Sequence, residues 1–194
     1  MPRDAGITID YRKHDGVERL LHHWRATLEE IALGFNRWEE ARVYGPGMYV
    51  AIVVGPSLGS YADPMGANRW PADGIRDVSS DWSGSVEAAT AVAYSQDGAV
   101  VCSVDGVVNQ QLVRFRTDMT DQELPYQPWM GSRHMSALDM STLDDVIATV
   151  TLSQESGRVT VFEDGTFESQ PREALGGRWR VEAAVETSVP SEQP

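Results

Sequence analysis

Residues 48–54 constrain the fold of this chain more than any other segment. Their sequence is MYVAIVV, a run of apolar and largely β-branched side chains that follows a chain-breaking Gly-Pro-Gly at positions 45–47. A run of this length and composition is typical of a strand that is covered on both faces. The segment therefore predicts an inner strand of a sheet that has helices packed against it.

A long amphipathic helix is predicted before this strand. Its apolar residues recur at steps of three or four: Val17, Leu20, Leu21, Trp24, Leu28, Ile31, Phe35 and Trp38. Asp15 is the expected N-cap, because Glu18 follows three residues later as in a capping box. We expect this helical part to span residues 15–41 and to pack its apolar face on the sheet. The alternative is a helix that uses this face to bind a partner protein.

Two Asp-Gly pairs in the second half of the chain predict β-hairpins, because each lies between two apolar runs. The pairs are Asp105-Gly106, between residues 99–104 and 107–115, and Asp164-Gly165, between residues 158–162 and 166–167. Further helices are predicted at residues 86–94 and 132–140, and a further strand at residues 146–152. The order α-β-α-β-β-α-β-β predicts an α/β fold with a mixed central β-sheet flanked by helices.

The remaining segments have less regular patterns. Residues 55–84 form a long stretch rich in Gly, Pro, Asp and Ser. Loops of this length within a compact domain are usually functional or disordered. We expect a single domain over residues 1–175 and a frayed acidic tail over residues 176–194.

The charge balance limits which ligands the protein can bind. Acidic residues number 29 against 16 basic ones, the formal net charge is -13, and Lys13 is the only lysine. An acidic surface with almost no lysine predicts a halophilic protein, since the screening length falls to about 3 Å at 1 M salt. The net field repels nucleic acid, so a polyanionic ligand must be held by local positive charge or by a metal.

The expected location is cytoplasmic, with no membrane partner. The chain has no run of about 18 apolar residues, and its first residues lack the apolar core of a secretion signal. Cys102 is the only cysteine. An intramolecular disulfide and a four-cysteine metal site are therefore excluded.

A third Asp-Gly pair, Asp97-Gly98, differs from the two hairpin pairs. A helix-like segment precedes it, and Ala99 begins an apolar strand. A carboxylate at the mouth of a strand is well placed for a ligand site, and a glycine lets a ligand approach the backbone. The alternative is an ordinary turn between the helix and the strand.

A second candidate site is the segment Gly131-Ser132-Arg133-His134. Ser132 is a plausible N-cap of the helix that follows, and a helix N-terminus attracts phosphate through its free N–H groups and its dipole. Arg133 adds a planar donor fork suited to phosphate oxygens, and His134 can donate a hydrogen bond or bind a metal. The alternative is an ordinary capped helix with polar surface residues.

A third candidate is the segment Ser153-Gln154-Glu155-Ser156-Gly157, between two predicted strands. It could be a simple polar turn. Because it places an acid at a strand edge, as Asp97 does, the two acids could instead hold one divalent metal.

Together the three segments resemble the catalytic domain of diadenylate cyclases, the DisA N-terminal domain family. The family's motifs are Asp-Gly-Ala, Gly-Thr-Arg-His-Arg-Ala-Ala and Ser-Glu-Glu-Thr-Gly. They are matched in the same order by residues 97–99, 131–137 and 153–157. The resemblance covers about residues 85–170, which would be the catalytic core, and residues 61–66 are similar to the archaeal branch of the family.

This resemblance implies a nucleotidyltransferase that condenses two ATP molecules into the second messenger cyclic di-AMP and releases two pyrophosphates. It implies a face-to-face homodimer or higher homo-oligomer and a divalent metal, Mn²⁺ or Mg²⁺. The implied catalytic residues are Asp97, Arg133 and His134. The implied substrate-binding residues are Gly98, Ala99, Ser132, Arg133, His134 and Ser153. Asp97 and Glu155 would bind the metal.

Two departures from the family pattern favour a different function. Met135 replaces the second arginine of the family's motif, and Gln154 replaces a glutamate. Side chains at positions 133 and 135 of a helix differ in direction by about 200°, so the family's second arginine would not contact the same phosphate as Arg133. Its replacement by Met135 could weaken ATP binding without removing the core chemistry. The main alternative is therefore a non-catalytic regulator of the same fold that binds ATP or cyclic di-AMP. A second alternative is an unrelated acidic scaffold that binds a protein through residues 16–40.

Overall fold

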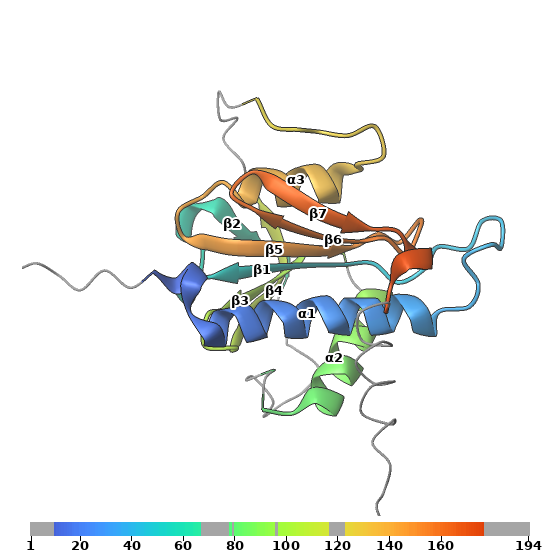
Figure 1. The fold of residues 1–194 in the computed structure, drawn as a ribbon, viewed down its shortest axis with the longest axis horizontal. Helices are drawn as coiled ribbons and strands as arrows, with labels where there is room; N and C mark the ends of the chain where they lie inside the picture. Colours follow the sequence, from blue (N-terminus) through green and yellow to red (C-terminus); the bar gives the residue numbers. More distant parts are fainter. Residues whose placement is uncertain (1–9, 67–77, 79, 96, 117–122, 177–194) are drawn as a thin grey trace, which may run out of the picture.

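The computed structural model describes residues 10–66, 78, 80–95, 97–116 and 123–176. Within these residues the chain forms a seven-stranded mixed sheet in the order β2-β4-β3-β1-β5-β6-β7 (Figure 1). The strands are β1 (Met48–Val53), β2 (Ala62–Pro64), β3 (Ala99–Ser103), β4 (Val108–Phe115), β5 (Val146–Leu152), β6 (Val159–Glu163) and β7 (Thr166–Gln170). β1 pairs parallel with β3, and the other neighbours are antiparallel. The predicted α/β fold with a mixed sheet is confirmed.

In the described part of the chain, three α-helices cover the sheet. α1 (Asp15–Gly34) and α2 (Trp82–Ser95) lie on one face, and α3 (Ser132–Met140) lies on the other (Figure 1). Three short 3₁₀ turns complete the described structure: η1 (Tyr11–Lys13), η2 (Gly59–Tyr61) and η3 (Arg172–Ala174). The predicted inner strand is β1, whose six residues are all buried.

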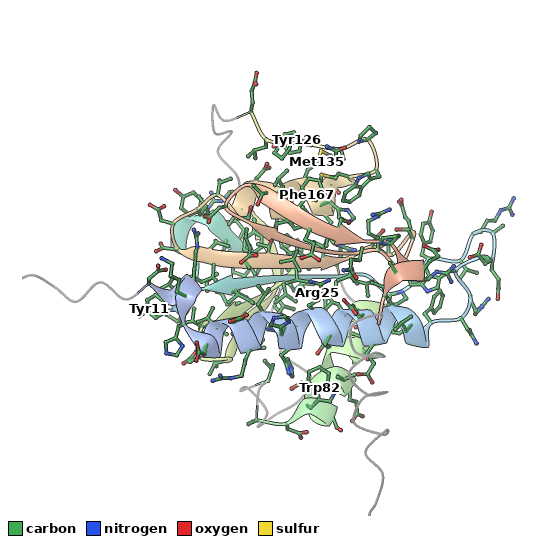
Figure 2. The ribbon with its side chains drawn as sticks, viewed as in Figure 1. Tyr11, Arg25, Trp82, Tyr126, Met135 and Phe167 are labelled. Carbon is green, nitrogen blue, oxygen red and sulfur yellow. The ribbon has the colours of Figure 1, made fainter. Side chains whose placement is uncertain are left out.

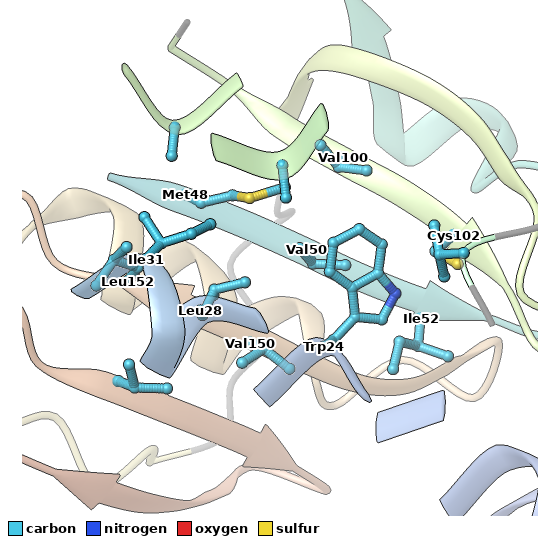
Figure 3. Packing of buried hydrophobic residues seen from close by; sticks show 14 of the residues in the cluster. Trp24, Leu28, Ile31, Met48, Val50, Ile52, Val100, Cys102, Val150 and Leu152 are labelled. Atoms are coloured by element: carbon cyan, nitrogen blue, oxygen red, sulfur yellow. The ribbon is translucent and has the colours of Figure 1, made fainter. Parts of the chain in front are cut away.

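The main hydrophobic core lies between α1 and the sheet (Figure 3). Trp24 and Leu28 are completely buried against strand residues that include Val50 and Val100. Fully burying a side chain such as leucine or valine stabilises the fold by about 1.5–3 kcal/mol. The apolar face of α1 is therefore covered by the sheet, as the packing hypothesis predicts, and is not open to a partner.

The helix begins at residue 15 as predicted, but its predicted N-cap and its predicted C-terminal end are wrong. The N-cap is His14, whose Nδ1 accepts a hydrogen bond from the Gly16 N–H, so Asp15 is already helical. The helix ends at Gly34, because the chain becomes extended at Phe35. Trp38 then folds back and donates its indole N–H to the Ala32 carbonyl at 3.0 Å. This bond satisfies one of the carbonyls that a helix C-terminus leaves free. Phe35 and Trp38 therefore continue the helical spacing of apolar residues although both lie beyond the end of the helix.

Both predicted hairpins are confirmed, and one strand was missed. Asp164 and Gly165 both have positive φ, at 49° and 71°, as a two-residue type I′ turn requires. The missed strand is β2, which lies in the predicted loop 55–84 and pairs antiparallel with β4. Residues 67–77 and 79 of that loop lie outside the described residues, as do residues 177–194 of the predicted acidic tail.

Candidate functional site

A pocket of about 540 Å³ opens at the end of the sheet where β1 and β3 begin and β5 ends. This size lies within the range typical of small-ligand sites. All the site residues predicted from the sequence line it: Asp97, Gly98, Ala99, Ser132, Arg133, His134, Ser153 and Glu155. The fold thus brings three segments that are far apart in the sequence into one place.

The Asp97-Gly98 turn joins the end of α2 to the start of β3. The Asp97 side chain is 92% exposed, and its Oδ1 accepts hydrogen bonds from the Gly98 N–H and from Arg133 Nη2. Gly98 has a φ of +103°, and a Cβ at this position would come within 2.6 Å of Met65 Cε and 3.1 Å of Leu112 Cα. Only glycine fits here, because both the backbone angle and the close contacts exclude a side chain.

The strand that Gly98 touches is itself irregular. Leu112 in β4 has a φ of +53°, and the register of the β3–β4 pair shifts between Ala99 and Val101. Such bulges are frequent beside functional sites, where they redirect neighbouring side chains. Here the bulge immediately precedes three β4 residues that line the pocket, Val113, Arg114 and Phe115.

The first turn of α3 lines the pocket. The N-cap is Gly131 rather than Ser132, and the first backbone bond of the helix runs from the Met135 N–H to the Gly131 carbonyl. The N–H groups before Met135 therefore have no intrahelical acceptor. Because Ser132 is the first helical residue and not the cap, its hydroxyl is not committed to closing the helix end.

Arg133 connects the three segments of the site. Its side chain is only 18% exposed, and Nη2 lies 3.3 Å from Asp97 Oδ1 and 3.4 Å from Gln154 Oε1. Gly47 makes room for it, since a Cβ at position 47 would lie 2.4 Å from Arg133 Nη1. The guanidinium is thus held at one end of the pocket, beside the N-terminus of α3, with the opposite charge of Asp97 next to it.

His134 is a buried and uncharged member of the site. It is 6% exposed, and burial, followed by the charges of Arg133 and Arg158, lowers its pKa to about 4. Its Nε2 is buried without a hydrogen-bond partner among the described residues. An unpaired buried polar atom is costly and is often found at functional sites. At neutral pH this imidazole can donate or accept a hydrogen bond but adds no positive charge.

Trp129 packs beside His134 and was not predicted as a site residue. The two rings meet edge to face at 5.2 Å, and the Arg158 guanidinium lies over the Trp129 ring at 4.7 Å. Trp129 also lines the pocket and is 37% exposed. Its position two residues before the predicted Gly131 segment is the only signal that the sequence offered.

The segment after β5 closes the pocket on the other side. Ser153 Oγ accepts a hydrogen bond from the Glu155 N–H, and the Gly157 N–H donates to the Ser153 carbonyl, so the segment forms a tight turn. The Glu155 side chain is exposed at the pocket rim. Within the described part of the chain, no three His, Cys, Asp or Glu residues are grouped as metal ligands. A metal held here would need ligands from a bound molecule in addition to Asp97 and Glu155.

Residues 85–167 match the model of one protein family, described as DisA bacterial checkpoint controller nucleotide-binding (DAC). The match begins in α2, ends in β7 and includes Asp97, Arg133, His134 and Glu155. It covers a little under half of the chain. No curated protein matches the sequence significantly.

Solved structures with the same fold include the following two. One is a protein of Bacillus cereus described as a hypothetical membrane spanning protein, with a TM-score of 0.53 and 14% identity over 77% of this chain. This chain spans 62% of that protein's length. The other is a double mutant of DacA from Staphylococcus aureus, with a TM-score of 0.51, 18% identity, and coverage of 86% of this chain and 99% of that one. No helix among the described residues is long and apolar enough to span a membrane.

Proposed function

We propose that this chain, whose residues 85–167 match the DAC family model, is a diadenylate cyclase that joins two ATP molecules into cyclic di-AMP. One observation carries this proposal. The Asp97 turn, the N-terminus of α3 and the Ser153–Glu155 turn meet in a single pocket, and Arg133 contacts both of the other segments. A helix N-terminus, an arginine and a pair of acidic side chains are the groups that bind a metal-associated triphosphate.

The reaction forms one bond and breaks one bond in each of two steps. The 3′-hydroxyl oxygen of one ATP attacks the α-phosphorus of the other, the bond to the bridging oxygen breaks, and pyrophosphate leaves with its electron pair. The hydroxyl proton passes to a base or to water. Repeating the step in the opposite direction closes the ring. Positioning and charge neutralisation supply most of the rate in such chemistry.

We assign the phosphates to the α3 end of the pocket. The free N–H groups of the first helical turn and the Ser132 hydroxyl would donate to phosphate oxygens, and the Arg133 fork would neutralise part of their charge. His134 would donate a hydrogen bond as a neutral imidazole. Asp97 would accept the hydroxyl proton or bind metal, and it has to leave Arg133 when a phosphate takes its place. Gly98, Ala99 and Ser153 would form the adjoining wall.

Asp97 and Glu155 both line the pocket, and their exposed carboxylates are the groups that would hold a divalent metal such as Mg²⁺ or Mn²⁺. Mg²⁺ is commonly held by one or two carboxylates together with substrate phosphates, which agrees with the absence of a larger ligand group among the described residues. When bound, the metal supplies positive charge to offset the repulsion between two triphosphates.

We infer that two protomers act together, face to face. Each protomer contributes one pocket of a size suited to one nucleotide, whereas the reaction consumes two. The product has twofold symmetry, and a twofold homodimer would bring two identical pockets into the required relation. If so, the rate per protomer should rise with protein concentration until the dimer is saturated.

The test is to incubate purified protein with ATP and Mn²⁺ or Mg²⁺ in molar KCl, which suits its acidic composition, and to analyse the products by chromatography and mass spectrometry. The proposal predicts cyclic di-AMP and pyrophosphate, and no product when a chelator is added. ATP binding without product would instead support the non-catalytic regulator that Gln154 and Met135 favour. A folded sample that does not bind ATP would contradict both functions.

A further inference from the structure

Two buried polar atoms on the α3 face of the sheet have no hydrogen-bond partner among the described residues. They are Nε2 of His134, on α3, and Oγ1 of Thr151, on β5. Thr151 is 0% exposed and His134 is 6% exposed, so neither atom is open to bulk solvent. A buried hydroxyl or imidazole nitrogen without a partner is costly, and each such atom in a folded protein calls for an explanation.

The packing of α3 on β5 places these two side chains in the same part of the interface. The Thr149 hydroxyl of β5 donates to the Ala137 carbonyl of α3 at 2.8 Å, which fixes the helix against the strand. Thr151 lies two residues further along β5 on the same face, about 7 Å nearer the pocket end of the strand. His134 lies three residues before Ala137, about 4.5 Å nearer the N-terminus of α3, and lines the pocket. Both side chains therefore lie between this contact and the pocket.

The hydroxyl groups beside Thr151 on the same face are already committed. Thr151 pairs in the sheet with Tyr49 of β1 and with Thr160 of β6. The Tyr49 hydroxyl donates to the Ser136 carbonyl at 3.2 Å. The Thr160 hydroxyl lies 2.8 Å from Ser169 Oγ. Of these three neighbouring hydroxyls, only that of Thr151 is left without a partner in the described part of the chain.

We propose that Thr151 is a positioning residue for His134: its hydroxyl donates to one buried water, which donates to Nε2 and so keeps the ring proton on Nδ1. Buried waters typically bridge polar groups that the protein itself leaves unsatisfied. The partner of one imidazole nitrogen decides whether the other carries the proton. Thr151 would thus set the tautomer of a residue in the pocket without lining the pocket itself.

The consequence for the reaction rests on the proposed function, since it assumes that the pocket binds ATP. Nε2 is enclosed, so Nδ1 is the ring nitrogen of His134 that can contact a ligand. With the proton on Nδ1, the neutral imidazole donates to a phosphate oxygen. With the proton on Nε2, it would turn a lone pair toward that oxygen and repel it.

The first experiment reads the tautomer of His134 by ¹⁵N NMR of histidine-labelled protein at neutral pH, without nucleotide. The chain has 4 histidines, and His134→Asn identifies the signals of this one. Protonated and unprotonated ring nitrogens have well-separated chemical shifts, and the wild type should show the proton on Nδ1. Thr151→Val, which keeps the shape and removes the hydroxyl, should shift the proton toward Nε2, the position that free histidine prefers. Thr151→Ser, which keeps the hydroxyl, should retain the wild-type tautomer.

The second experiment measures the binding of ATP and of inorganic tripolyphosphate by calorimetry, with chelator present to prevent turnover. Thr151→Val should weaken both about tenfold, because a hydrogen bond to a phosphate is lost. Thr149→Val is the matched control, since Thr149 lies on the same strand and face and is also 0% exposed. It loses its bond to α3 and should be less stable, but its tautomer and both affinities should equal those of the wild type. Unfolding curves establish that each variant is folded.

Three outcomes would overturn the inference. The first is a wild-type protein in which Nε2 carries the proton. The second is a Thr151→Val variant with the wild-type tautomer. The third is an equal loss of affinity in Thr149→Val and Thr151→Val, which would assign the effect to general packing. A tautomer that depends on Thr151 in a folded wild type that binds neither ATP nor tripolyphosphate would support the positioning role and overturn the proposed function.

Discussion

The two faces of the central sheet bury different kinds of side chain, and both kinds occur in the single strand β5. Its residues Ala148, Val150 and Leu152 face α1 and belong to the large apolar core. Thr149 lies on the α3 face, where its hydroxyl donates to the Ala137 carbonyl of α3 at 2.8 Å. The α1 face carries the largest apolar cluster, whereas the α3 face combines two smaller apolar clusters with specific hydrogen bonds such as this one.

The α3 face also carries the polar groups of the site. His134, Ser141 and Thr149 are buried there, whereas the core beneath α1 contains Trp24 and Leu28 at 0% exposure. Apolar packing is non-directional and tolerates many arrangements, but hydrogen-bonded groups hold a fixed geometry. The α1 face therefore holds the largest apolar cluster, while the α3 face also holds the residues of the pocket in place.

The largest loss of stability should come from a cavity in the apolar core beneath α1. Trp24→Ala should lower the free energy of unfolding by about 3–5 kcal/mol, because it leaves a large cavity in the core. Leu33→Ala on the same helix is the control, since Leu33 is 44% exposed. Urea denaturation followed by circular dichroism measures both. Similar losses for the two variants would contradict the assignment of the core to the inner face of α1.

The buried imidazole on the α3 face should make stability depend on pH. His134 has a folded pKa of about 4, below the ordinary value of 6.5, so the unfolded chain binds more protons between these two values. Stability should therefore fall as the pH drops from about 6.5 to 4, by roughly 2–3 kcal/mol. His134→Asn should remove this part of the pH dependence, whereas His22→Asn, on the half-exposed surface of α1, should not. An unchanged pH profile for His134→Asn would contradict the lowered pKa.

A smaller effect should follow from moving Arg133 without removing it. Gly47→Ala places a Cβ 2.4 Å from Arg133 Nη1 and 2.8 Å from Gln154 Cβ, so the guanidinium has to shift. We expect ATP affinity to weaken about tenfold, as misplacing a positioning group by a short distance commonly does. Gly34→Ala is the matched control, because a Cβ there meets nothing within 4 Å. Wild-type ATP affinity in Gly47→Ala would show that Arg133 does not need its present position.

The smallest effect should come from the residue that departs from the family motif. Met135 is 40% exposed and does not line the pocket, although its neighbours Arg133 and His134 do. Met135→Ala should therefore change the rate of product formation at saturating ATP by less than about twofold, as is usual for an exposed side chain. A tenfold loss would place Met135 in a contact with the second protomer.

The fold was predictable where local pattern and burial agree. β1 and β5 are apolar because they are covered on both faces, and Ser132–Met140 is helical as its spacing indicated. Prediction failed where tertiary contacts decide. Trp38 continues the helical spacing but belongs to a chain reversal that caps α1. β2 has only three residues and is a strand because β4 lies beside it.

Some residues of the candidate site were also predictable from the sequence, and others were not. Asp97, Arg133 and Glu155 lie in recognisable local motifs, and the fold brings all three to the pocket. Arg114 and Met65 carry no such signal. Each reaches the pocket through the pairing of β2 with β4, which is a tertiary event that the sequence pattern does not encode.

The catalytic role of Asp97 is tested most directly by comparing cyclic di-AMP production by the wild type and by Asp97→Asn, together with their free energies of unfolding. Asp97 is exposed, so its replacement by an isosteric amide should change stability by less than about 0.5 kcal/mol. Product formation should fall by about 10²–10³-fold, as expected for loss of a catalytic carboxylate. Equal production by both proteins would contradict the claim that this face of the sheet performs the reaction through Asp97.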